Sequence, residues 1–135
     1  MSAVQHRPAD QTRPLVAVLC SVPLLREAVG SALEFAEVLA FEGGRGDLAG
    51  LLRWLRPDVL IVDCEEDARQ AQAFAQEHGL PVLFISLRER ALRVLRGDAW
   101  VQVGNGEGPT PETVRNVIAG ALFARGHPDE GDPGQ

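Results

Sequence analysis

The chain has 135 residues, a length that suits a single domain of ordinary size. Hydrophobic residues make up 45% and charged residues 24%, a globular composition that excludes a disordered chain. The 19 acidic residues outnumber the 13 basic ones and aromatic residues are only 5%, which argues against a nucleic-acid-binding surface. No apolar run approaches the length of a membrane span. We therefore expect a cytoplasmic protein that contacts neither a membrane nor nucleic acid.

The types of basic and sulfur-containing residues exclude further kinds of reaction and of structure. All 13 basic residues are arginine, so mechanisms that need a lysine, such as Schiff-base catalysis or a lysine-containing phosphate loop, are excluded. The 2 cysteines are too few for a disulfide framework.

Short apolar runs alternate with amphipathic segments along the chain. We expect strands over residues 15–20, 37–41, 58–63, 81–86 and 100–103. We expect helices over residues 23–33, 65–78 and 88–96, between the cap residue Asp47 and Pro57, and from Thr110 or Pro111 onward. The segment 88–96 is expected to be a short, very basic helix, and the glycine-rich stretch 104–108 a flexible connection.

Strands that alternate with helices are typical of parallel βαβ units with helices on both faces of the sheet. The pattern predicts an α/β fold with a five-stranded, flavodoxin-like parallel sheet in the order 2-1-3-4-5. This domain is expected to span residues 14–125, between flexible tails at residues 1–13 and 126–135. In such a sheet, sites lie beyond the carboxyl ends of the strands, near the switch between strands 1 and 3. The residues expected there are Cys20, Ser21, Asp63, Cys64, Ser86 and Gly104.

Three stretches of the chain look like parts of one known family. Residues 18–28 (VLCSVPLLREA) look like its first strand and the start of its first helix. Residues 57–63 (PDVLIVD) and 80–86 (LPVLFIS) look like its third and fourth strands. From about residue 15 to residue 123, the chain resembles the receiver domain of bacterial response regulators, the signalling proteins of two-component systems.

The resemblance implies a phosphoacceptor position at Asp63 and a switch position at Ser86. In that family, two adjacent carboxylates after the first strand help to hold Mg²⁺, and a lysine follows the fifth strand. Here Cys20 and Ser21 occupy the acidic positions and Gly104 the lysine position. Because phosphoryl transfer needs cations to neutralise developing charge, phosphorylation of Asp63 should be very slow or absent. We therefore expect an atypical receiver, a pseudo-receiver, that is not an enzyme and uses no metal or cofactor.

Such a module would act by protein–protein interaction with a partner that the sequence does not identify. Receivers commonly form contacts through helix 4, strand 5 and helix 5. On this chain the resemblance puts Arg90, Arg93, Trp100 and Arg115 on that face. We expect a homodimer or a heteromer through it, although Trp100 is as consistent with an ordinary core position.

Alternatives stay open at this stage. The spacing of Cys20 and Arg26 matches low-molecular-weight tyrosine phosphatases, and a cysteine after the first strand is similar to sugar-transport IIB phosphocarriers. Pro23 and its bulky neighbours fit a phosphate-binding loop poorly. Cys20 and Cys64 end neighbouring strands, so a regulatory disulfide is a further hypothesis. A small ligand in the vacated pocket is another. Each residue also has a plain explanation, Asp63 as a polar strand end and the cysteines as inert buried thiols.

Overall fold

The structure is a computed structural model that describes residues 13–42, 47–103 and 110–126. Residues 1–12 and 127–135, which belong to the predicted tails, lie outside the described residues, as do Gly104 and the rest of the predicted connection at 104–108. The described part forms an α/β fold with one six-stranded mixed sheet, in the strand order β3-β2-β4-β5-β6-β7. The strands are β2 (Leu15–Leu19), β3 (Glu37–Phe41), β4 (Val59–Val62), β5 (Val82–Ser86), β6 (Ala91–Arg96) and β7 (Ala99–Val103). The helices are α1 (Pro23–Ala32), α2 (Leu48–Leu55), α3 (Glu65–His78) and α4 (Pro111–Gly126).

The α/β class is confirmed, and the prediction of five parallel strands is wrong. Strands β3, β2, β4 and β5 pair in parallel, but β6 pairs antiparallel with β5, and β7 antiparallel with β6. The order of the parallel strands, 2-1-3-4, agrees with the expected flavodoxin-like order. The difference therefore lies in the chain beyond β5.

In place of the predicted helix over residues 88–96, the structure has the end of a turn followed by strand β6. Only the turn at residues 87–90 separates β5 from β6, which is too short for a parallel crossover. Gly97 and Asp98 then form a two-residue loop between paired Arg96 and Ala99, and Gly97 has a φ of +66°. A β-hairpin thus occupies the place of the expected fourth helix and fifth parallel strand.

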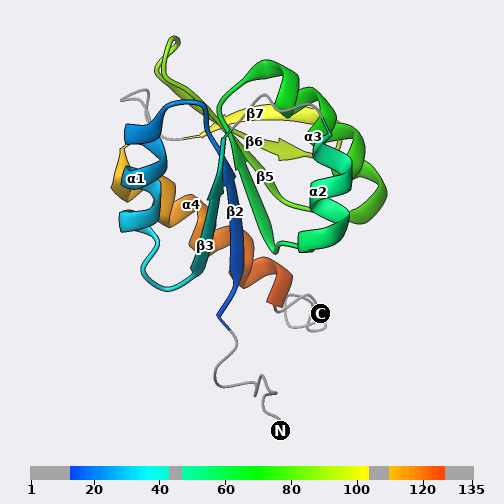
Figure 1. Ribbon diagram of the computed structural model, residues 1–135, viewed down its shortest axis with the longest axis horizontal. Helices are drawn as coiled ribbons and strands as arrows, with labels where there is room; N and C mark the ends of the chain where they lie inside the picture. Colours follow the sequence, from blue (N-terminus) through cyan, green and yellow to red (C-terminus); the bar gives the residue numbers. More distant parts are fainter. Residues whose placement is uncertain (1–12, 43–46, 104–109, 127–135) are drawn as a thin grey trace, which may run out of the picture.

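Two apolar layers hold the sheet between its helices. Helices α1 and α4 cover one face, and α2 and α3 cover the other (Figure 1). The runs of β2 and β4 are buried on both faces, since alternate residues such as Val18 and Leu19 belong to different layers. This double burial explains why the central strands read as continuous apolar runs.

Local signals set the helix ends. The side chain of Asp47 accepts a hydrogen bond from the Gly50 N–H, as expected of the cap of α2. Helix α1 begins with Pro23, and α3 ends at Gly79, which has a φ of +71°. The loops after β2 and β4 emerge side by side because these two strands run parallel and in register.

Candidate functional site

Ser21 and Asp63 meet at the carboxyl ends of β2 and β4. Leu19 and Val62 are register partners, so the residues after them leave the sheet side by side. The Ser21 backbone N–H donates to both carboxylate oxygens of Asp63, each at 3.0 Å. The Ser21 hydroxyl lies 3.2 Å from Oδ2 and 3.4 Å from Oδ1 of the same carboxylate. The expected proximity of these positions is confirmed, and the carboxylate is held by neutral donors.

Cys20 points into the molecule. Its side chain is fully buried in the apolar layer beneath α1 and α4. The pKa of the Cys20 thiol is raised from 9.0 to about 12, chiefly by burial and also by the negative charges of Asp63 and Asp67, while the positive charge of Arg26 acts in the opposite direction. The Arg26 guanidinium donates to the Cys20 carbonyl oxygen at 2.7 Å. Cys20 is therefore a protonated core thiol at neutral pH, and Arg26 is already engaged with the backbone.

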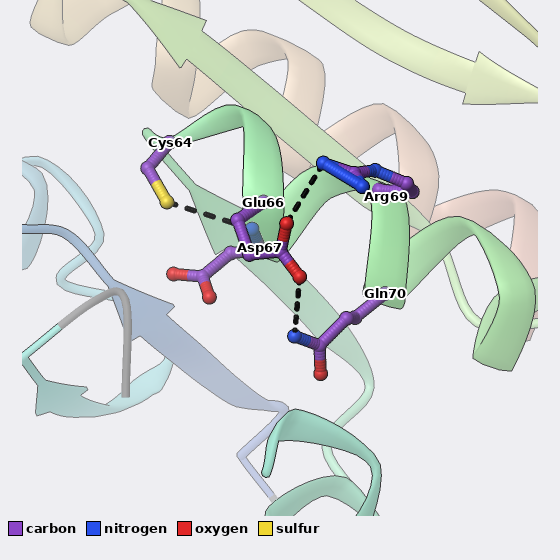
Figure 2. A network of polar contacts seen from close by, with 5 residues as sticks. All are labelled: Cys64, Glu66, Asp67, Arg69 and Gln70. Atoms are coloured by element: carbon purple, nitrogen blue, oxygen red, sulfur yellow. Dashed lines mark hydrogen bonds and ion pairs between the residues drawn. The ribbon is translucent and has the colours of Figure 1, made fainter. Parts of the chain in front are cut away.

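Cys64 begins α3 on the other side of the sheet. Its Sγ accepts a hydrogen bond from the Asp67 N–H at 3.5 Å (Figure 2). Burial also raises the pKa of the Cys64 thiol. Both cysteines are free thiols. Because Cys20 belongs to the α1/α4 layer and Cys64 caps a helix of the α2/α3 layer, the two side chains leave the sheet toward different layers.

Asp67 is a site residue that the sequence reasoning missed. It is 1% exposed, and it is the buried charged residue of the described part of the chain. Its carboxylate points away from the neighbouring pairs that Glu66 makes with Arg69 and Gln70 (Figure 2). In the sequence Asp67 looks like an ordinary acid in the first turn of a helix, where the helix dipole favours negative charge. The sequence pattern alone does not show that Asp67 is buried while its neighbours Glu65 and Glu66 are exposed.

Ser86, at the predicted switch position, caps a turn. Its hydroxyl accepts a hydrogen bond from the Glu89 N–H at 3.1 Å, which fixes the turn after β5. The turn projects beyond the end of the sheet at which the parallel strands end (Figure 1). Gly104, at the lysine position, lies outside the described residues.

The predicted interaction face does not exist in the expected form, because no helix lies between β5 and β7. Arg93 is on β6, opposite Phe84 in register, and pairs with Glu89 at 2.6 Å. Trp100 packs edge-to-face on Phe84 with ring centroids 5.8 Å apart, in the α2/α3 layer. Arg115, on α4, lines a shallow cavity of about 320 Å³ beside the end of α1, on the other side of the sheet. Arg90 lies in the turn with a φ of +55°. The four residues therefore do not form one surface.

A large hollow lies at the opposite end of the parallel strands from Asp63. It is an open groove of about 1030 Å³ between the β6–β7 loop, the start of β5 and α4. Its lining is mostly apolar and includes Leu80, Val94, Val103, Val117 and Ala121. The groove and the Ser21–Asp63 site are thus separate features.

Within the described ranges, no three or more His, Cys, Asp or Glu side chains are placed to hold a metal ion. None of the helices described is both long and apolar enough to cross a membrane. Comparisons with protein-family models, curated proteins and solved structures found no match for this chain.

Proposed function

We propose that this protein is a non-catalytic, receiver-like signalling module of the bacterial cytoplasm that acts by binding another protein, independently of phosphorylation. The observation that carries the proposal is the state of the Asp63 carboxylate. Both of its oxygens accept hydrogen bonds from Ser21, at the position where a receiver has an acid.

In this contact, the neutral donors of Ser21 take the place that a cation has beside the acceptor carboxylate of a receiver. In the receiver family, the second acid and the acceptor share a cation, and the cation draws in the phosphoryl group. Here the Ser21 N–H and hydroxyl stabilise the unmodified carboxylate directly. A phosphoryl group on Asp63 would have to displace these donors without a cation held by a neighbouring acid. The geometry therefore favours a fixed structural link between β2 and β4 over a modification site.

The enzyme alternatives built on Cys20 are less well supported. A nucleophilic cysteine needs a lowered pKa and access to its substrate. The Cys20 thiol has a pKa raised to about 12 and is fully buried. Arg26 would have to leave the Cys20 carbonyl to bind a phosphate. These contacts favour a binding module over a phosphatase or a phosphocarrier.

Exposure to Mg²⁺ and beryllofluoride, a mimic of the acyl phosphate, tests the proposal. We expect no adduct at Asp63 and no movement of the Ser86 amide signal in NMR spectra. The matched control is Asp63→Asn, which keeps an oxygen that can accept from Ser21. A stoichiometric adduct on the wild-type protein that is absent from Asp63→Asn would overturn the proposal.

Restoring a receiver-like acid gives a second measurement. Ser21→Asp is the suitable variant, because Ser21 is exposed, whereas an acid at Cys20 would bury a charge in the apolar layer. We expect Mg²⁺ to stabilise Ser21→Asp against thermal unfolding and to leave the wild-type protein unchanged. Equal stabilisation of both proteins would contradict the assignment of Ser21 as the degenerate position.

A further inference from the structure

Strand β7 leaves one edge of the sheet open. It is the last strand of the order β3-β2-β4-β5-β6-β7, so only one of its edges pairs with β6. The peptide groups along its outer edge have no hydrogen-bond partner among the residues that the structure describes. An unpaired edge of this kind is a template for another strand.

The composition of β7 does nothing to prevent such pairing. Its sequence, AWVQV, contains no charged residue and no proline, the usual means by which proteins protect an open edge. Strand β3, at the other edge, begins with the exposed Glu37 and is followed by Glu42. The two edges therefore differ, and β7 is the one open to association.

We propose that β7 pairs antiparallel with β7 of a second copy of this chain and joins two sheets into one. A twofold axis at Val101 pairs all five residues of the strand: Val101 with itself, Trp100 with Gln102, and Ala99 with Val103. The two Val101 side chains, each 40% exposed in the single chain, then cover one another on the same face of the joined sheet.

The charges near the edge are compatible with this pairing. Within β7 no charged side chain meets its own copy across the axis. Asp98 immediately precedes the strand, and because the two copies run in opposite directions, the two Asp98 residues lie at opposite ends of the paired strands. An antiparallel pair of identical strands therefore gives the outward peptide groups of both copies hydrogen-bond partners and places no like charges opposite each other.

This inference names a second copy of the chain as a partner of the proposed binding module. It rests on the proposed function only in that both require a binding surface. The first measurement is the molar mass of the full-length protein over a series of concentrations, by sedimentation. We expect a reversible monomer–dimer equilibrium. We also expect the amides of residues 99–103 to exchange with solvent more slowly as the dimer forms. A purely monomeric protein, or a dimer in which these amides exchange as in the monomer, would overturn the inference.

Variants at the axis give the second measurement. Val101→Lys places two like charges opposite each other, and the dimer dissociation constant should rise by about tenfold or more. The matched control is Leu24→Lys, which adds the same charge at a residue of α1 that is 67% exposed, and which should leave the constant unchanged. Mixing Val101→Lys with Val101→Glu should restore a heterodimer, which also shows that both variants are folded.

The outcomes for the two proposals are distinguishable. Dimerisation through β7 together with a beryllofluoride adduct at Asp63 would overturn the proposed function and support the strand pairing. A purely monomeric protein in which Asp63 stays unmodified would overturn the strand pairing and leave the proposed function standing. If β7 of that monomer then paired with a strand of a different protein, the partner at this edge would be that protein and not a second copy.

Discussion

Alkaline pH should destabilise this protein through Cys20. The pKa of the Cys20 thiol is raised in the folded state from 9.0 to about 12, chiefly by burial. The folded chain then keeps this proton where the unfolded chain loses it, so stability is complete below about pH 9 and falls as the pH rises toward 12. The slope approaches about 1.4 kcal/mol per pH unit, which amounts to about 2 kcal/mol by about pH 10.5.

The composition makes this effect measurable. The chain has no lysine and no tyrosine, the residues whose titration usually dominates this pH range, and arginine stays charged. Cys64 contributes in the same direction, since burial raises the pKa of its thiol too.

The assay is urea unfolding at a series of pH values, followed by far-UV circular dichroism. Cys20→Ala should flatten the decline in the free energy of unfolding, whatever its effect at neutral pH. Cys64→Ser is the control that removes the smaller contribution. An unchanged slope in Cys20→Ala would refute the burial argument and reopen the enzyme hypotheses.

Urea unfolding of four further variants, one of them a control, tests a packing contact and two helix ends. Trp100→Ala removes the contact with Phe84 and the indole bond to Gln72 at 3.2 Å, and should cost about 3 kcal/mol, whereas Trp54→Ala, at a side chain 76% exposed, should be nearly neutral. Equal effects would mean that Trp100 is not part of the packed layer. Asp47→Ala removes the cap of α2 and should cost about 1 kcal/mol. Gly79→Ala, at a φ of +71°, should cost about 1 kcal/mol, and a stabilised variant would contradict the left-handed end of α3.

The part of the fold that the sequence predicted well is the parallel half, whose central strands are buried on both faces. Strand β3 and helix α3 have the predicted bounds, and the other parallel strands differ from the prediction by one or two residues at their ends. Continuous apolar runs and helix caps are strong local signals, and both are determined by neighbours a few residues away.

The hairpin was missed because its signals compete. Arginine favours helices, and the arginines of segment 88–96 led to the prediction of a basic helix. In β6, however, Leu92 and Val94 face one layer and Leu95 faces the other, which is the alternation of a strand. The Gly-Asp pair at residues 97 and 98, between the apolar runs of β6 and β7, was the local signal for a hairpin.

The candidate site divides in the same way. The meeting of Ser21 and Asp63 results from strand order, and the sequence predicted it. The burial of Cys20 agrees with its place at the end of the apolar run 15–20, whereas the burial of Asp67 depends on how α3 packs, which no local pattern encodes. The hydrogen bonds of Ser21 to Asp63 likewise require the register of β2 and β4.

The exchange of a helical unit for a hairpin bears directly on where this protein can bind. In the parallel half of the sheet, helices cover both faces and the strand ends carry a carboxylate that Ser21 already satisfies. In the hairpin, β7 keeps an open edge, an exposed Val101 and a neighbouring apolar groove. The receiver-like face of helix 4, strand 5 and helix 5 cannot serve, because its first helix is absent. Under the proposed function, the surface for association therefore moves from a helical face to a strand edge, where backbone hydrogen bonds supply the affinity and side-chain register supplies the specificity.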